Sequence, residues 1–172
     1  MKSLFLLRHA KSSWSDPSLD DFDRTLNPRG RQACGLVAAY IASHRMAPDL
    51  VLCSAAQRVR ETVDGLVGAF DAPPQIVFEE SLYMAAADRL LARLHAVPDD
   101  VGTVMMVGHN PGLEDLAGAL VGGGDPAAAA RMMEKYPTAA LAVFTLTADR
   151  WRDVGRQGAT LDAFVRPRDL TD

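Results

Sequence analysis

Residues 4–11 read LFLLRHAK, and this stretch joins the pattern of a buried strand to a cluster of cationic side chains. The continuous apolar run of Leu4 to Leu7 is typical of a strand that is covered on both faces. The run ends at Arg8, His9 and Lys11. Positive charge at the end of a buried strand costs free energy unless an anion compensates it. The stretch therefore predicts a buried strand that carries cations to an anion-binding site.

The rest of the chain alternates between short apolar runs and helical patterns. Further strands are predicted at 50–53, 75–78, 103–107 and 139–147, with weaker candidates at 151–154 and 160–165. Helices are predicted from the Asn27-Pro28 cap onward, from Ser54 to about Phe70, at 86–96, at 113–120 and from the alanine run 127–130, and Gly122–Gly124 is interpreted as a flexible break. This alternation predicts a single three-layer α/β/α domain over residues 1–172, with a mostly parallel central sheet that becomes mixed toward the end of the chain.

Composition narrows the class of protein. The 172 residues include 18 basic and 22 acidic ones, a formal net charge of −4, and no sign of the basic face that nucleic-acid binding requires. Cys34 and Cys53 match no metal-ligand spacing and are interpreted as buried thiols in a reducing compartment. Arg8 and Lys11 interrupt the N-terminal apolar run, and no stretch reaches the roughly 18 apolar residues of a membrane span. These patterns predict a cytoplasmic monomer without nucleic-acid or membrane partners.

Polar side chains follow three of the predicted strands, at the point where each apolar run ends. They are Arg8 and His9 after the first run, Ser54 and Arg58 after the second, and Gly108, His109 and Asn110 after the run 103–107. Because ligands of open α/β sheets bind beyond the carboxyl ends of the strands, these segments are expected to meet at one edge of the sheet. The sequence thus predicts a pocket that contains two arginines and two histidines.

This combination favours phosphoryl-transfer chemistry. The guanidinium group presents a planar fork of donors that matches phosphate oxygens and stabilises their charge during transfer. Histidine is a competent nucleophile toward phosphorus, and helices that begin after Ser54 and Asn110 would point free N–H groups at an anion. The sequence contains no P-loop, no Gly-x-Gly-x-x-Gly fingerprint and no obvious carboxylate cluster for Mg²⁺. A phosphohistidine route that needs no metal and no cofactor is therefore predicted.

Four segments, in this order, carry a resemblance to a known family: LFLLRHAKSSW, DRTLNPRGRQA, PDLVLCSAAQRVRET and VMMVGHNPGLE. Arg8-His9-Ala10 resembles the Arg-His-Gly signature of the histidine phosphatase superfamily, and alanine in place of this glycine is usual in its SixA-type branch. The four segments together are similar to SixA-type phosphohistidine phosphatases, and the resemblance covers nearly the whole chain. It implies a phosphoglycerate mutase-like fold and a signal-transduction phosphatase. The implied substrate is a phosphohistidine-carrying protein of the phosphotransfer or histidine kinase type.

The resemblance also implies roles for individual residues. His9 would be the transiently phosphorylated nucleophile, and Arg8 and Arg58 would hold the phosphoryl oxygens. His109 would bond the phosphoryl group and stabilise the charged transition state. The further substrate-binding residues would be Lys11 and Asn110.

The wider superfamily places a general-acid carboxylate after the third strand, and this sequence has no definite counterpart. Glu79, Glu80 and Asp88 are available there, but the pattern assigns none of them to the pocket. An alkoxide leaving group needs a proton in the transition state, whereas phosphohistidine that is protonated on its distal ring nitrogen departs as neutral imidazole. The absence of a defined acid therefore favours an N–P substrate over a phosphate ester.

Two alternatives remain open at this level. The same pocket would suit a phosphatase of small phosphate monoesters, and a phosphohistidine-binding module would use it without turnover. A mutase is disfavoured because no extra segment is visible that would retain an intermediate, and the short chain leaves no large insertion to form a lid. Ordinary roles are expected for other polar residues: Ser54 as a helix cap, His44 at a helix terminus, His95, Arg60, Asp20, Asp21 and Asp23 in solvent, and Trp14 at the pocket rim or as a loop anchor.

Overall fold

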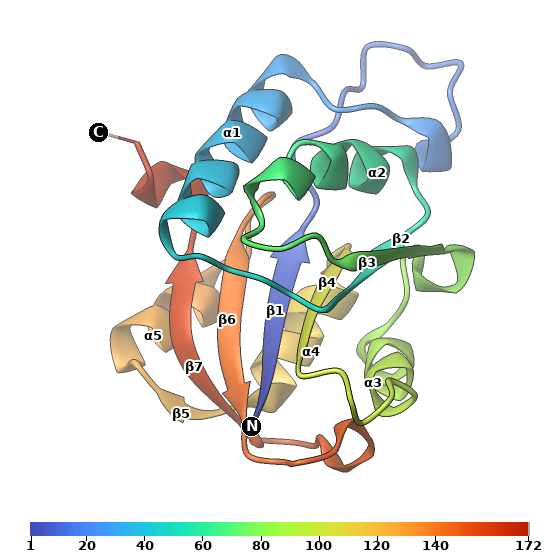
Figure 1. The fold of residues 1–172 in the computed structure, drawn as a ribbon. Coiled ribbons are helices and arrows are strands. Elements are labelled where there is room, and N and C mark those ends of the chain that lie inside the picture. The colour runs from blue at the N-terminus through green and yellow to red at the C-terminus, as the bar shows by residue number, and fades with distance from the viewer. Residues whose placement is uncertain (172) are drawn as a thin grey trace.

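The computed structural model describes residues 1–171, in which helices cover both faces of one seven-stranded sheet (Figure 1). The strands are β1 (Lys2–Arg8), β2 (Leu50–Ser54), β3 (Gln75–Glu79), β4 (Thr103–Gly108), β5 (Val121–Gly124), β6 (Leu141–Leu146) and β7 (Ala159–Val165). The α-helices are α1 (Pro28–Ser43), α2 (Gln57–Asp64), α3 (Ala87–His95), α4 (Gly112–Leu120) and α5 (Pro126–Glu134). Short 3₁₀ turns lie at Asp21–Asp23, Val67–Ala69, Glu80–Leu82, Trp151–Asp153 and Pro167–Asp169.

The strand order β3-β2-β4-β1-β6-β7-β5 puts the first strand in the centre of the sheet. Every neighbouring pair is parallel except β1–β6 and β6–β7, so that β6 alone runs opposite to the other strands. The predicted mostly parallel sheet with a mixed end is therefore confirmed. In the β1–β4 pair Arg8 lies opposite Gly108, so the residues that follow these two strands emerge side by side.

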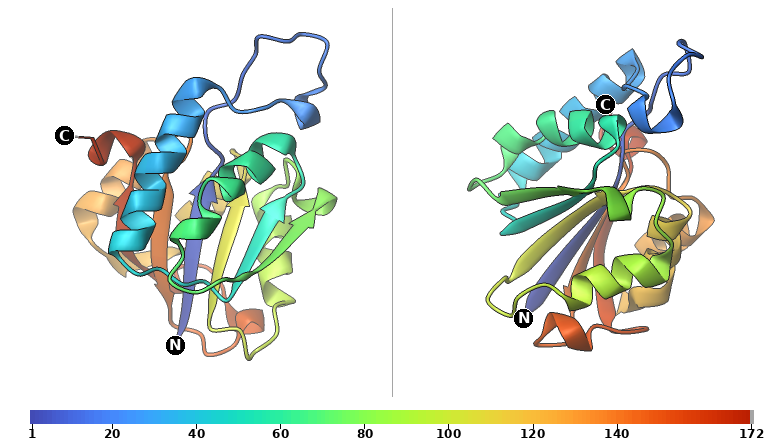
Figure 2. Two further views of the ribbon diagram at one scale, coloured as in Figure 1. Left: turned by 45° about the horizontal axis from the view of Figure 1, so that its top comes forward. Right: turned by 90° about the vertical axis from the view of Figure 1, so that its right-hand side faces the viewer.

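The apolar run of β1 is continuous because the two faces of the strand enter two different cores. Leu4 and Leu6 pack with helices α3, α4 and α5. Phe5 and Leu7 pack with α1 and α2 on the opposite face. The two layers of helices are separated by the twisted sheet in the right-hand view of Figure 2. The predicted α/β/α arrangement is confirmed, and it aligns the carboxyl ends of six strands along one edge.

The end of α2 differs from the prediction of a helix from Ser54 to about Phe70. Ser54 is the last residue of β2, and the helix spans only Gln57–Asp64. The chain leaves the helix at Gly65, whose N–H bonds the carbonyls of Glu61 and Thr62, and a 3₁₀ turn follows. The prediction was too long because the residues of this turn, Val67–Ala69, are largely apolar and continue the helical pattern in the sequence beyond the end of the helix.

The three glycines at 122–124 form part of strand β5, and their interpretation as a flexible break was wrong. A Cβ atom on Gly122 would lie 1.9 Å from the carbonyl oxygen of Gln157, and one on Gly124 would lie 2.2 Å from that of Leu161. Gly124 also has a φ of +111°, which side-chain-bearing residues rarely adopt. Glycine is required at 122 and 124 so that β5 can lie close to β7 and to the turn that precedes it.

The end of the chain fits the remaining expectations in part. The strand predicted at 160–165 is present as β7, and the strand at 139–147 is present as the shorter β6. The segment 151–154 contains a 3₁₀ turn instead of a strand. Trp151 in this turn is fully buried, and its indole N–H donates to the carbonyl of Val101 at 2.7 Å. The segment was predicted as a strand because it contains a large aromatic residue, but that residue is buried from a turn.

Candidate active site

A pocket of about 330 Å³ opens at the carboxyl ends of β1, β2 and β4. The loop that leads from β1 to α1 contributes several of its lining residues, and this loop rises above the sheet in Figure 1. All six residues predicted to form the site line this pocket: Arg8, His9, Lys11, Arg58, His109 and Asn110. The other lining residues are Ser12, Trp14, Asp21, Arg24, Met84 and Thr138.

His9 is held in one tautomer by the chain that follows β1. Its backbone N–H donates to the carbonyl of Gly108, and its ring Nδ1 lies 2.7 Å from the carbonyl oxygen of Ala10. Because a carbonyl only accepts, Nδ1 must carry the proton, which leaves a lone pair on Nε2. Burial, followed by the charges of nearby arginines, lowers the pKa of His9 to about 4. At neutral pH, His9 is thus an uncharged imidazole with a free nucleophilic nitrogen.

His109 lies against His9, with 5.2 Å between the ring centroids. Arg58 donates from Nη2 to Nδ1 of His109 at 3.3 Å, so the ring proton is on Nε2 and is donated to the hydroxyl of Ser54 at 2.7 Å. Burial, then His9 and Arg58, lowers the pKa of His109 to about 3. The pocket therefore contains two neutral histidines beside cationic groups, a charge balance that favours an incoming anion.

These depressed pKa values predict a loss of stability in weak acid. Between about pH 4 and 6.5 each of these histidines is protonated in the unfolded chain but neutral in the folded chain. Acid therefore favours the unfolded chain, and the free energy of unfolding falls as the pH falls. For His9 alone the decrease between pH 7 and pH 5 is about 2 kcal/mol. Urea denaturation of the wild type and of His9→Gln at both pH values measures it, and a wild-type stability that falls no more than that of the variant would contradict the prediction.

Three arginines, one more than predicted, converge on the pocket. Arg24 was missed, and its guanidinium donates to the hydroxyl of Ser12. Arg8 donates to the carbonyl of Tyr136 at 3.1 Å. The Nε atoms of Arg8, Arg24 and Arg58 are all buried without a hydrogen-bond partner among residues 1–171. Burial lowers the pKa of both Arg8 and Arg24, and the charge of Arg58 contributes. Unsatisfied buried donors with like charge point to an anionic ligand.

Asp21 contacts two of these arginines, whereas the sequence pattern had placed it in a solvated loop. Its carboxylate accepts a hydrogen bond from Arg58 at 3.0 Å and another from the hydroxyl of Tyr83, and it forms an ion pair with Arg24 at 3.2 Å. Its backbone carbonyl accepts a further bond from Arg58 at 2.6 Å. Partial burial acts to raise the pKa of Asp21, but Tyr83 and the arginines outweigh it and lower this pKa. Asp21 thus orients the arginines and remains ionised.

Ser54 has a different role from the helix cap that was expected. Its hydroxyl accepts from His109 and from the N–H of Ala56, and it is fully buried behind the histidine. Thr62 supports His9 in a similar way, because its hydroxyl accepts from the N–H of Ala10 at 3.0 Å and donates to the carbonyl of Arg58. Neither role could be predicted, because no local sequence pattern shows that a serine or threonine will bond a histidine, or the backbone beside one, in a distant segment.

Lys11 and Asn110 occupy the margins of the pocket. Lys11 is exposed and lines both this pocket and a neighbouring groove. Asn110 donates from Nδ2 to the carbonyl of Tyr136 at 2.9 Å and to Glu114 at 3.2 Å, whereas its buried Oδ1 has no partner within the described chain. Their contact with a substrate stays a prediction.

The carboxylates considered as general acids lie outside the pocket. Glu79 forms a two-pronged ion pair with Arg93 at 2.8 Å, and Asp88 accepts from the N–H of Arg89 on α3. Neither these two nor Glu80 lines the pocket, and Asp21 is the one carboxylate among the described lining residues. Because Asp21 is held ionised by two arginines, it is a poor proton donor.

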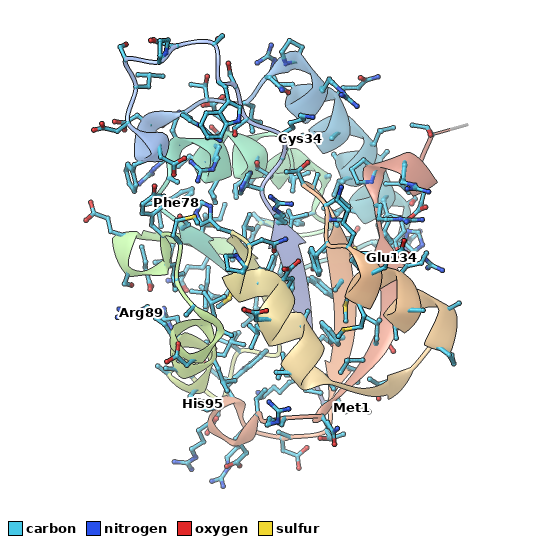
Figure 3. The ribbon with its side chains drawn as sticks, turned by 180° about the vertical axis from the view of Figure 1, so that it is seen from behind. Met1, Cys34, Phe78, Arg89, His95 and Glu134 are labelled. Carbon is cyan, nitrogen blue, oxygen red and sulfur yellow. The ribbon has the colours of Figure 1, made fainter. Side chains whose placement is uncertain are left out.

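Several other expectations concern residues around the pocket and beyond it. His44 bonds the carbonyl of Tyr40 at the end of α1, as predicted, and Arg60 turns away from the pocket over the ring of Phe78. Trp14 is 78% exposed at the pocket rim, with the guanidinium of Arg24 3.4 Å from its ring centroid. His95 was expected in solvent, but its Nε2 donates to the carbonyl of Val154 at 2.7 Å and links α3 to the 3₁₀ turn below it (Figure 3).

Metal-binding clusters and membrane-spanning helices are both absent from residues 1–171. No group of three or more His, Cys, Asp or Glu side chains in this range is arranged to hold a metal ion. Within the same range, none of the helices combines the length and the apolar character that crossing a membrane would require.

Comparison with known proteins identifies the family. Residues 4–83 match the model of the histidine phosphatase superfamily (branch 1). An uncharacterized protein of Mycobacterium tuberculosis is 39% identical over 164 residues, which cover 94% of this chain and all of that protein. A candidate phosphohistidine phosphatase SixA from Agrobacterium tumefaciens is 34% identical, with a TM-score of 0.81 over 96% of this chain and 98% of the other. A second candidate SixA, from Nakamurella multipartitia, is 30% identical, with a TM-score of 0.83 over 96% of both chains.

The chain therefore belongs to the histidine phosphatase superfamily and has its phosphoglycerate mutase-like α/β fold. Within the superfamily it belongs to the SixA-type branch. Membership identifies the chain as a phosphatase, that is, a hydrolase of phosphate groups, and the resemblance noted in the sequence is confirmed at this level.

Proposed function

We propose that this phosphatase hydrolyses phosphohistidine on a partner protein through a covalent phospho-His9 intermediate. The observation that carries the proposal is the combination of groups in one pocket. His9 is neutral and has a free Nε2, three arginines lie beside it, and Asp21, the one carboxylate among the described lining residues, is held ionised. Such a pocket can bind and attack a phosphoryl group but is poorly equipped to protonate an alkoxide. Imidazole is a leaving group that does not need this proton.

In the first step, Nε2 of His9 attacks phosphorus in line with the substrate nitrogen. The Nε2–P bond forms as the substrate N–P bond breaks, and the electron pair of that bond stays on the departing imidazole. The distal ring nitrogen keeps its proton, so that the leaving group is neutral. The positive charge that develops on His9 is stabilised by the bond from Nδ1–H to the carbonyl of Ala10.

In the second step, water attacks phosphorus and the Nε2–P bond returns its electron pair to His9. Oxygen and both protons of the water leave with the phosphoryl group as dihydrogen phosphate. The arginines stabilise charge on the equatorial oxygens in both steps, because all three line the pocket and their guanidinium groups offer several N–H donors. A bound dianion also raises the pKa of His109. When Nδ1 of His109 takes a proton, it gives up the bond that it accepts from Arg58 and donates to a phosphoryl oxygen instead.

The rim of the pocket supports a side chain of another protein as substrate. Trp14 is 78% exposed and Met84 48% exposed, and both line the entrance. Exposed apolar groups beside a polar pocket suit an imidazole ring that is presented from a protein surface. The names of the two SixA neighbours support the same substrate class, and a carrier of the phosphotransfer or histidine kinase type fits a signalling role.

Substrate preference tests this proposal. We expect kcat/KM for a phosphorylated histidine-containing phosphotransfer protein to exceed that for sugar and nucleotide phosphates by ~10²–10⁴-fold, the usual contribution of a general acid, since the alkoxides that leave from these esters would lack one here. Phosphate release is the measurement. Equal or faster turnover of an ester would establish the monoesterase alternative, and tight binding without phosphate release would establish the non-catalytic binding module.

A further inference from the structure

A second concavity lies beside the catalytic pocket. It is a groove of about 500 Å³ between α1, the segment that connects α5 to β6, and the 3₁₀ turn Pro167–Asp169. Its lining residues are Lys11, Arg29, Gln32, Ala33, Leu36, Lys135, Pro137, Thr138, Arg166, Pro167, Arg168 and Thr171. The α1 helix and the C-terminal turn flank it on the left of Figure 1.

The described part of this groove is strongly basic in a protein whose net charge is negative. Four cationic side chains are exposed along it: Lys11, Arg29, Lys135 and Arg168. A fifth, Arg166, forms a two-pronged ion pair with Asp169 at 2.8 Å and also lies in the field of Glu134. Because Asp169 and Glu134 offset the charge of Arg166, the positive charge of the other four side chains is left in excess along the groove. An acidic occupant would be attracted to this surface.

The remaining lining indicates which kind of acidic molecule fits. Four half-buried residues of the lining are apolar, namely Ala33, Leu36, Pro137 and Pro167. Of the described lining residues none is aromatic, so the groove lacks the stacking platforms that single-stranded nucleic acid uses. Half-buried apolar residues beside exposed cations match a polypeptide segment of mixed acidic and apolar character.

The groove is continuous with the catalytic pocket, because Lys11 and Thr138 line both. A polypeptide in the groove would therefore present its neighbouring residues at the pocket entrance. We infer that the groove docks an acidic segment of the substrate protein that adjoins its phosphohistidine, an inference that rests on the proposed function. Docking there raises the effective concentration of the phosphorylated side chain at His9 and accelerates encounter by electrostatic attraction.

Charge reversal at the far side of the groove tests this inference. In Lys135→Glu/Arg168→Glu both changed side chains are exposed and lie outside the catalytic pocket. We expect kcat/KM for the phosphorylated phosphotransfer protein to fall by about 10-fold or more, through KM, with a loss that shrinks at high salt. Turnover of phosphoramidate, a small N–P substrate, should stay within twofold of wild type. The matched control Arg89→Glu/Arg152→Glu changes the net charge equally, at exposed positions away from the groove (Figure 3 labels Arg89), and should keep both activities.

Each other outcome overturns the inference in a recognisable way. Unchanged kcat/KM for the phosphoprotein would show that nothing docks in the groove, and an equal loss on phosphoramidate would assign its residues to the catalytic pocket instead. An equal loss of kcat/KM in the control variant would show that the effect comes from the net charge of the protein and not from the groove. Stronger inhibition of the wild type by a single-stranded oligonucleotide than by an acidic peptide would assign the groove to nucleic acid. If the wild type hydrolyses phosphoramidate but not the phosphoprotein, the proposed substrate itself fails.

Discussion

Replacing His9 by alanine is expected to abolish the phosphoenzyme and to lower turnover by ~10⁴- to 10⁶-fold, as removal of a nucleophile does in other covalent enzymes. His9 is the histidine whose tautomer the backbone fixes, with Nδ1 bound to Ala10 and Nε2 free. His109 has both ring nitrogens engaged, by Ser54 and by Arg58. This difference in hydrogen bonding supports the proposed roles of His9 as the nucleophile and of His109 as its electrostatic partner.

Labelled phosphohistidine protein, mixed with the enzyme and quenched, measures this effect. Wild type should trap acid-labile phosphate on the peptide that contains His9, and His9→Ala should trap none. His44→Ala is the matched control, because His44 is exposed at the end of α1, where it stacks on Tyr40 outside the pocket. Label on His109 in the His9→Ala variant, or labelling equal to wild type, would refute the assigned nucleophile.

Patterns that repeat along the chain predicted the fold correctly. The run of Leu4 to Leu7 indicated a strand buried on both faces, and the core residues indeed alternate between two layers of helices. Polar residues that follow parallel strands meet at one edge of a sheet, and this rule alone placed Arg8, His9, Arg58 and His109 in one pocket, where all four lie. Local pattern and a general rule of sheet topology were sufficient for these residues.

What the sequence did not reveal depends on contacts between distant segments. Arg24 and Asp21 lie in an aperiodic loop, and only the folded loop places them against Arg58. Ser54 became a partner of His109 because β2 ends behind that ring. The glycines 122–124 looked flexible because the close approach of Gly122 and Gly124 to Gln157 and Leu161 cannot be seen in one segment. The basic groove likewise gathers cations from four separate stretches of the chain.

Replacing Arg8 by methionine is expected to separate activity from stability. Removal of one preorganised donor to a transition-state oxyanion typically costs ~10²–10³ in turnover, and we expect this loss here. The folded state should nevertheless be no less stable. Burial lowers the pKa of Arg8, with Arg58 adding to this effect and Glu114 opposing it, so the charged side chain is held at a cost. The carbonyl of Tyr136 would keep its second donor, Asn110, at 2.9 Å.

Thermal unfolding with and without inorganic phosphate, alongside turnover, distinguishes the two contributions. The Arg8→Met variant should match or exceed the melting temperature of the wild type without phosphate and should gain less from phosphate, because binding to the native state alone determines that gain. Arg8→Lys should recover only part of the activity, since an ammonium group keeps the charge but lacks the two-pronged fork. If activity falls only in proportion to a drop in melting temperature, Arg8 is a structural residue. A half-buried cation that costs stability but serves catalysis is the trade-off expected where a site is preorganised for a charge that only its substrate supplies.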